Sequence, residues 1–304
     1  MLKSYKLTLG RVVENAKEDA PILLFTNPDK REKDQLIEKY GIDRHSLHSA
    51  LDPDELSRLE FESDHVVFIF KEPKNYSAKE KLVFKTETLG VFYFKKRLII
   101  VTSGDLELTD PEHFNNIDSP LCLFLKLIYM TIFHFFEHLK VINMISAELE
   151  QKINRSMENR YLISMFTLEK SLVYYLDAIN SNTALIEKLK LNAAKIGFNP
   201  EETEYLEDIA IENGQCYKQA EIYSNILASL MDARASIVGN NLNTLMKTLN
   251  IITIALMVPT LVVSIFSMNV KIPMSGVEHG FWIIIGLAAI SMTAFLLFWR
   301  YRKW

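Results

Sequence analysis

The sequence contains little cysteine and no excess of positive charge. Its two cysteines, Cys122 and Cys216, are far apart and form no CxxC pair. We interpret both as reduced, buried, small hydrophobic residues in a cytosolic region. A net charge of −4 and an isoelectric point near 6.0 give no sign of a nucleic-acid partner. The segment Met1–Gly10 has no apolar run, so we expect no cleavable signal peptide.

Charge is absent from two apolar spans near the C-terminus, Thr248–Met268 and Gly280–Trp299, which the short segment Asn269–His279 joins. A helix needs about 20 residues to cross about 30 Å of hydrocarbon at about 1.5 Å per residue, and each span has that length. Everything before Thr248 is typical of a soluble domain. The sequence therefore predicts a large water-exposed domain followed by a two-helix hairpin in the lipid bilayer.

The charges that flank the spans predict the topology. Arg300, Arg302 and Lys303 lie at the end of the second span, whereas the joining loop has one lysine, Lys271, together with Glu278. Because cytoplasmic flanks of membrane helices carry the excess of Lys and Arg, we expect the loop outside and the C-terminus inside. Two crossings then place both termini in the cytoplasm of an integral cell-membrane protein.

The first 118 residues predict an α/β domain. Four runs rich in Val, Ile and Phe read as strands: Pro21–Thr26, His65–Phe70, Lys81–Thr88 and Gly90–Thr102. Asn27-Pro28 is a cap followed by proline, and predicts a helix that runs toward Tyr40 and ends at Gly41.

Proline and glycine become sparse after Pro120, and long helical patterns take over, at about 120–158, 163–196 and 201–268. No proline interrupts residues 201–258, so one helix can run about 100 Å from the cytoplasm into the membrane. Such a helix needs neighbours, either the preceding helices or copies of itself. The expected organisation is an α/β domain (1–118), a helical stalk (119–247), a first membrane helix that lines a pore (248–268), an external loop (269–279) and a second membrane helix with a basic tail (280–304).

Polar residues form a stripe along the end of this long helical pattern. Its members recur at spacings of seven, three and four, which place them on one helix face: Asn243, Asn250, Thr253, Met257, Thr260, Ser264 and Ser267. One interpretation is helix–helix packing through small and hydroxylated residues. The other is a water-filled pore, which the two asparagines favour because a buried carboxamide is costly unless it is satisfied. Two spans cannot enclose a pore, so this interpretation requires a homo-oligomer.

A separate motif, H-x-x-E-H, spans His134, Glu137 and His138. On a helix the two histidines share a face and could bind zinc, as in one class of metalloprotease. The flanks are strongly apolar, which suits a packed helix better than an open catalytic cleft. We therefore expect no enzyme here, and no catalytic residue is assigned.

Several segments resemble the CorA superfamily of divalent-cation channels. Family members carry Gly-Met-Asn at the outer end of the first span, and this chain has Ser267-Met268-Asn269 there. As in the family, a loop with Pro273, a second span and a basic–aromatic tail follow. Four further stretches resemble family segments in the same order, namely Leu51–Glu60, Tyr205–Ile209, Leu230–Ser236 and Asn243–Ile252. The resemblance implies a homopentameric funnel that carries Mg²⁺ into the cytoplasm, with Mg²⁺ as the transported and the regulatory ion.

The resemblance also implies roles for single residues. Asn269, with Met268 and Ser267, would form the selectivity ring at the outer pore mouth, since carboxamide oxygens can accept hydrogen bonds from the waters of a hydrated ion. Met246, Leu249 and Met257 would form a hydrophobic gate within the polar stripe. Asp208 would bind a regulatory metal between subunits, near Ser49 of the N-terminal domain.

The sequence also departs from the family pattern. Ser267 replaces the glycine of the signature, Pro259 stands one position later than expected, and the acidic residue after Pro273 is missing. Two alternatives stay open on these grounds. One is a member selective for Zn²⁺, Co²⁺ or Ni²⁺, and the other is a non-conducting member that acts as a metal sensor or membrane scaffold.

Overall fold

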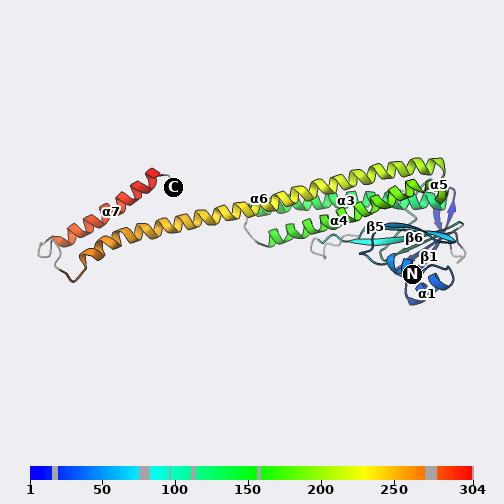
Figure 1. Ribbon diagram of the computed structural model, residues 1–304, viewed down its shortest axis with the longest axis horizontal. Coiled ribbons are helices and arrows are strands. Elements are labelled where there is room, and N and C mark those ends of the chain that lie inside the picture. The colour runs from blue at the N-terminus through cyan, green and yellow to red at the C-terminus, as the bar shows by residue number, and fades with distance from the viewer. Residues whose placement is uncertain are drawn as a thin grey trace. The chain divides into compact units, whose positions relative to one another are not determined.

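The structure is a computed structural model and describes residues 1–15, 20–74, 83–95, 97–110, 114–155, 159–270 and 279–302. It divides into two compact units, Met1–Met231 and Asp232–Trp304. Figure 1 labels the elements of both units.

A seven-stranded mixed sheet forms the centre of the first unit, in the order β2-β1-β3-β7-β6-β5-β4. The strands are β1 (Leu2–Thr8), β2 (Arg11–Glu14), β3 (Ile22–Thr26), β4 (Arg58–Phe61), β5 (His65–Pro73), β6 (Thr86–Phe94) and β7 (Arg97–Thr102). Only β3 and β7 pair in parallel among these strands, and the other neighbours are antiparallel. The predicted α/β domain is confirmed.

Two of the predicted strands have different boundaries in the structure. Gly90–Thr102 was expected to be one strand, but β6 and β7 are an antiparallel pair in which Phe94 lies opposite Arg97. The charged residues between the two apolar halves favour a solvent-exposed turn over a buried strand interior. Of the run expected at Lys81–Thr88, Lys81 and Leu82 lie outside the described residues, and β6 begins at Thr86.

Two short helices, α1 (Lys30–Glu38) and α2 (Arg44–Ser49), lie between β3 and β4. The cap of α1 is Asp29, and not the expected Asn27, because Asp29 and Glu32 form a reciprocal capping box. Gly41 ends the segment as predicted, with a left-handed backbone (φ 72°) that glycine adopts without steric cost.

Two long helices, α3 (Pro120–Arg155) and α4 (Asn159–Leu191), cover one face of the sheet. The short α5 (Ala193–Ile196) and the start of α6 (Pro200–Phe266) follow, and α6 packs with α3 and α4. Successive side chains of each strand point to opposite faces of the sheet. Phe68 and Phe70 pack with the long helices, whereas Val67 and Ile69 pack with α1 and α2. Figure 1 shows the long helices together on one side of the sheet.

The two cysteines differ in environment. Cys216 is buried, as expected, and burial raises the pKa of its thiol to about 12. Cys122 is only half-buried, because it lies one turn into α3 at the surface, so the expectation of a buried residue was wrong for Cys122.

The second unit contains the end of α6 and α7 (Gly280–Arg302). α6 is one helix of 67 residues, roughly 100 Å long, and Pro259 lies inside it without ending it. Within the described residues, three helices are long and apolar enough to cross a membrane: α3, α6 and α7. Half of the residues in the most apolar stretch of α3 are buried, whereas none in the corresponding stretches of α6 and α7 is buried. The apolar residues of α3 therefore belong to the hydrophobic core of the first unit.

Candidate ion pathway and metal-binding residues

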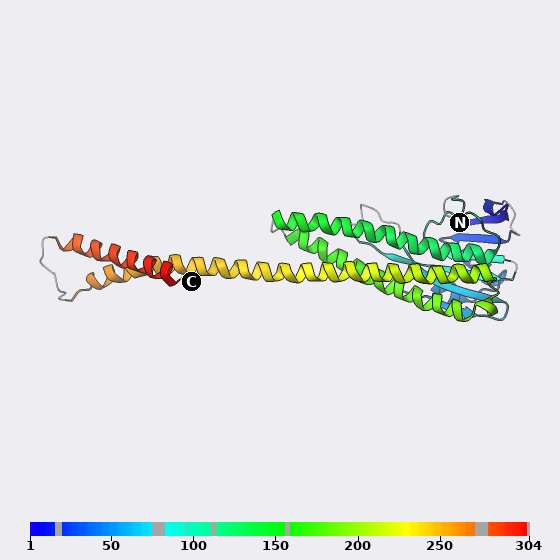
Figure 2. The same cartoon turned by 90° about the horizontal axis from the view of Figure 1, so that it is seen from above.

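One face of the end of α6 packs toward α7. Its half-buried residues recur every three or four positions, at Ile251, Ala255, Val258, Val262 and Phe266. The half-buried residues of α7 follow the same spacing, at Ile284, Ala288, Ser291 and Phe295. Figures 1 and 2 both show α7 running back alongside the end of α6. This spacing is the one expected for the facing sides of two helices in a hairpin.

The polar stripe lies on the opposite face of α6. At about 100° per residue, its centre is about 180° around the helix from the half-buried row. All its members are exposed, including both asparagines, Asn243 and Asn250. The apolar residues predicted for the gate share this exposure: Met246 (51%), Leu249 (57%) and Met257 (63%). α7 therefore leaves the predicted pore face uncovered.

The hydroxyl groups on the stripe donate their hydrogen bonds within the helix. Thr253 Oγ1 donates to the Leu249 carbonyl at 2.9 Å, and Thr260 Oγ1 to the Leu256 carbonyl at 2.6 Å. Ser264 is on the same face. Because the donors are satisfied internally, the hydroxyl oxygens can still accept a hydrogen bond from water.

α6 ends at Phe266, directly before the predicted selectivity residues. The Ser267 hydroxyl and its amide both donate to the Ser264 carbonyl, at 2.9 and 3.1 Å, and so close the last turn. Met268 and Asn269 follow in an exposed bend. The predicted loop residues Lys271, Pro273 and Glu278 lie outside the described residues.

Of the charges predicted at the inner end of the second span, Arg300 and Arg302 lie in the last turn of α7. Lys303 lies outside the described residues.

Asp208 lies on the exposed side of α6, in the first unit. It lines an open cavity of about 330 Å³ with Lys126 and Tyr129 of α3 and with Tyr205 and Glu212 of α6. Lys126 Nζ lies 4.9 Å from the centre of the Tyr205 ring, and the rings of Tyr129 and Tyr205 are 5.8 Å apart. The site thus offers carboxylates beside a cation.

Ser49, the residue expected near Asp208, does not line the Asp208 cavity within one chain. Ser49 lines a different cavity, of about 520 Å³, together with His48, Asp52 and Glu55. Its hydroxyl accepts a hydrogen bond from Arg58 Nη2 at 3.0 Å. Nowhere in the described ranges do three or more His, Cys, Asp or Glu side chains gather to hold a metal ion. A site that unites Asp208 with Ser49 would need two chains.

The H-x-x-E-H histidines are part of the packing between α3 and α4. The rings of His134 and His138 are 4.5 Å apart, but His138 is buried and its Nδ1 lies 2.6 Å from the Tyr175 hydroxyl. Burial lowers the pKa of His138 to about 4, so the ring is neutral at physiological pH. The phenol hydroxyl therefore donates to Nδ1, and the pair is a satisfied core contact.

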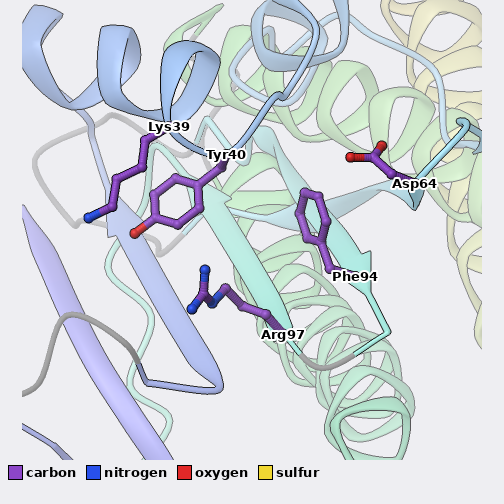
Figure 3. A pocket seen from close by; sticks show the side chains of 5 residues that line it. All are labelled: Lys39, Tyr40, Asp64, Phe94 and Arg97. Carbon is purple, nitrogen blue, oxygen red and sulfur yellow. The ribbon is translucent and has the colours of Figure 1, made fainter.

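A pocket that the sequence did not reveal lies at one end of the sheet (Figure 3). Lys39, Tyr40, Asp64, Phe94 and Arg97 line a volume of about 350 Å³. These residues are separated along the chain. The pairing of β5, β6 and β7 brings Asp64, Phe94 and Arg97 together, and the packing of the end of α1 on the sheet adds Lys39 and Tyr40.

A family model described as "CorA-like Mg2+ transporter protein" matches residues 19–303. The chain belongs to the CorA-like Mg²⁺ transporter family. The resemblance inferred from the motifs is confirmed. The CorA-like family is one of transporters and channels for divalent cations, and not a family of enzymes.

Individual CorA-like proteins agree with this family. The chain is 24% identical over 288 residues to the cobalt/magnesium transport protein CorA of Methanocaldococcus jannaschii, a match that covers 91% of this chain and 89% of the relative. The complete structure of the CorA magnesium transporter from M. jannaschii aligns with a TM-score of 0.81 at 21% identity, covering 98% of this chain and 96% of that one. The full-length CmaX structure aligns with a TM-score of 0.75 at 15% identity, covering 100% and 98%. The predicted CorA-like fold is confirmed over nearly the whole chain.

Proposed function

We propose that this chain conducts divalent cations, with Mg²⁺ as the main ion, into the cytoplasm through a pore lined by α6. Several copies of the chain form the pore, five according to the resemblance stated above. The membrane potential drives the cation inward, since each positive charge gains about 2.3 kcal/mol per 100 mV. Both termini lie in the cytoplasm, and α6 and α7 are the two crossings.

The observation that carries this proposal is the division of α6 into two faces. Ile251, Val258 and Val262 face α7, and the polar stripe faces away from it. In a bilayer an exposed row of asparagine and hydroxyl groups is costly against lipid, so another surface must cover it. Copies of the same stripe around an axis satisfy one another and enclose water.

The outer end of α6 suits a hydrated ion. Mg²⁺ releases its inner water reluctantly, so a site for passage benefits from neutral acceptors that bind the water shell. Asn269 repeated around the axis supplies carboxamide oxygens, and Ser267, two residues earlier, adds hydroxyls. Met268 lies between them and limits the width of the opening.

The inner half of the stripe supports a gate. Met246, Leu249 and Met257 are large, exposed and apolar, and they lie among polar residues on the same face. A ring of such side chains excludes water when it narrows, and a dehydrated segment blocks a divalent ion.

We also propose that Asp208 takes part in a metal site between subunits. Asp208 is exposed, and Glu212 lines the same cavity, so the carboxylate oxygens of both residues are available to bind an ion. Ser49 with Asp52 and Glu55 of an adjacent subunit would complete the site. Metal bound there stabilises the closed arrangement of the subunits, and its loss shifts the population toward the open one.

Cation uptake into proteoliposomes tests the transport proposal. The purified full chain should take up Mg²⁺ down an inside-negative potential, and parallel assays with Co²⁺, Ni²⁺ and Zn²⁺ rank the ions. A higher rate for one of the last three would identify a differently selective member. An assembled protein that binds metal but shows no uptake of any of the four would overturn conduction, in favour of the sensor or scaffold.

A further inference from the structure

A cavity of about 300 Å³ lies between α1 and α2, on the face of the sheet opposite the long helices. Its inner lining is apolar, because Leu47 is buried and Ile37 and Leu51 are half-buried. Three cations, one imidazole and one carboxylate complete the lining: Lys30, Lys33, Arg44, His48 and Asp34. We call this the α1–α2 cavity. It combines an apolar interior with a mainly positive rim.

The three cations of the α1–α2 cavity have no counter-charge of their own. The ion pairs of the described residues include none of them. The acids nearby are engaged elsewhere: Asp29 and Asp43 accept from amides in the first turns of α1 and α2, and Glu32 accepts from the N-terminal amine. The cavity therefore presents a net positive charge, even with Asp34 included.

The start of α6 has the opposite charge. The segment 200–217 contains six acidic residues and no lysine or arginine. At about 100° per residue, four of the six fall within about 80° of one another, and we call this the acidic face: Glu201, Glu204, Asp208 and Glu212. Ile211, which is 59% exposed, lies at its margin. Lys126 is the cation of the Asp208 cavity, and it supplies one positive charge against four carboxylates.

The two charged surfaces are on opposite sides of the domain, so they cannot meet within one chain. α1 and α2 pack on one face of the sheet, and the start of α6 belongs to the helical layer on the other face. Figure 1 shows α1 and the start of α6 on opposite sides of the sheet. In a ring of identical subunits, each subunit contacts its two neighbours through two different surfaces. Complementary charges on opposite sides of one domain suit such a head-to-tail contact.

The α1–α2 cavity is also continuous with the surface proposed to complete the Asp208 site. The Ser49 cavity of about 520 Å³ shares three lining residues with it, namely Lys33, His48 and Leu51. A neighbouring α6 that brings Asp208 to the Ser49 cavity therefore also brings the acidic face to the edge of the α1–α2 cavity.

We infer that the α1–α2 cavity of one subunit binds the acidic face of α6 of the next subunit. The inference rests on the homo-oligomer proposed above. Lys30, Lys33 and Arg44 pair with carboxylates of that face, and Ile211 packs on the apolar interior. Exposed ion pairs contribute little singly, so the apolar contact is part of the binding. Because both charges belong to the chain itself, the contact persists without divalent metal, and metal at Asp208 adds to it.

Zero-length cross-linking of the full chain in detergent tests this inference. A carbodiimide joins a lysine amine to a carboxylate only where the two groups touch, and mass spectrometry then identifies the joined peptides. We expect Lys30 or Lys33 to be joined to carboxylates of residues 201–212, in a cross-linked dimer, in buffer freed of divalent metal as well as with Mg²⁺. The yield should fall several-fold between about 50 mM and about 1 M salt, because salt screens exposed charges.

Charge reversal gives the sharper result. Lys33→Glu with Arg44→Glu should lower the cross-linking yield of Lys30 at least about fivefold, because the cavity then repels the acidic face. Adding Glu201→Lys and Glu204→Lys should restore most of the cross-linked dimer. The matched control is Lys6→Glu with Lys140→Glu, which reverses two exposed lysines that line neither the α1–α2 nor the Asp208 cavity, and it should keep the wild-type yield.

Size-exclusion chromatography separates this inference from the transport proposal. An assembled oligomer in which neither Lys30 nor Lys33 is joined to residues 201–212 would overturn the inference and leave the proposed pore intact. A wild-type yield in Lys33→Glu with Arg44→Glu would overturn it as well. A chain that stays monomeric would overturn both proposals.

Discussion

Asn182 of α4 bonds both backbone polar groups of Lys71 in β5. Its Oδ1 accepts from the Lys71 amide at 2.9 Å, and its Nδ2 donates to the Lys71 carbonyl at 2.8 Å. Lys71 lies beyond the part of β5 that pairs with β4, and the Asn182 carboxamide forms the hydrogen bonds that a residue of β4 would otherwise form. Ser57, directly before β4, donates its hydroxyl to the same Oδ1 at 2.7 Å. One side chain thus joins the helical layer to the sheet.

Asn182→Ala should destabilise the N-terminal domain by about 2–4 kcal/mol, because two buried backbone groups lose their partners. Thermal unfolding of the full chain in detergent measures the effect. Asn192→Ala is the matched control, since Asn192 donates only to the exposed Lys188 carbonyl. Equal melting temperatures for the two variants would show that water replaces the carboxamide at Lys71.

Glu72 and Glu87 lie directly opposite each other on β5 and β6, and each is only 8% exposed. Burial, with the charge of Glu87 as a smaller cause, raises the pKa of Glu72 to about 8. Thr102 Oγ1 donates to Glu72 at 3.3 Å, and Ser103 Oγ donates to Glu87 at 3.2 Å. The pair therefore holds a proton at neutral pH.

This proton makes the stability of the domain depend on pH. The ordinary pKa of 4.5 describes Glu72 in the unfolded chain, so between pH 4.5 and about 8 the folded state binds more protons. Stability is then fully present below pH 4.5 and falls as pH rises through about 8, by a few kcal/mol in all. Glu72→Gln should flatten this part of the melting-temperature profile, whereas the exposed Glu62→Gln should not. A profile of Glu72→Gln that parallels the wild type between pH 5 and 9 would contradict the assignment.

The fold could be predicted where one local pattern decided it. The strands at Ile22–Thr26 and His65–Pro73 are dense in β-branched and aromatic residues, and α6 follows from the lack of proline before Pro259. The strands β1, β2 and β4 carry few such residues, and only their pairing with buried neighbours makes them strands. The cap at Asp29 was missed because Asn27-Pro28 gives a similar local signal.

The candidate sites divide in the same way. The polar stripe is a periodic pattern on one helix, so its residues could be named from the sequence. The Lys39–Tyr40–Arg97 pocket could not, since its members meet only where the end of α1 packs on the sheet beside the turn between β6 and β7. The half-buried row of α6 could in principle be predicted from the spacing of Ile251, Ala255, Val258 and Val262. It was not, because Leu, Ile and Val also occupy most other faces of this part of the helix.

Single cysteines along α6 test which face lines water. Asn250→Cys and Met257→Cys should react with a small aqueous thiol reagent in proteoliposomes. Ile251→Cys and Val258→Cys, on the half-buried face, should react at least about tenfold more slowly, since access rather than thiol chemistry limits them. The unmodified chain controls for Cys122 and Cys216. Equal labelling at all four positions would reject the pore face.

Asp208 is expected to make the stalk sensitive to metal. Mg²⁺ at millimolar concentration should slow proteolysis of the wild-type oligomer several-fold, because an occupied site stabilises the state that resists cleavage. Asp208→Asn keeps the shape and removes the charge, so it should abolish most of this protection. Glu204→Gln is the control on the same helix, since Glu204 is exposed and does not line the Asp208 cavity. Undiminished protection in Asp208→Asn would place the regulatory metal elsewhere.

Asn269 gives the sharpest test of selectivity. Asn269→Ala removes every carboxamide of the ring at once but disturbs little packing, because the residue lies in an exposed bend after α6. Each lost hydrogen bond to the ion's water shell is worth about 1 kcal/mol, so Mg²⁺ uptake should fall at least about tenfold. Asn269→Asp keeps the shape but adds a negative charge per subunit, which should hold a divalent ion too tightly and also slow uptake.

Ser267→Gly tests whether Ser267 contributes to selectivity in addition to Asn269. It restores the glycine of the family signature and keeps Asn269, so it should preserve uptake or shift the preference toward Mg²⁺. Size-exclusion chromatography in detergent checks that each variant still assembles. An assembled Asn269→Ala protein with wild-type uptake would show that selectivity arises elsewhere along the stripe. In that case Asn269 is only an exposed residue of the bend that follows α6.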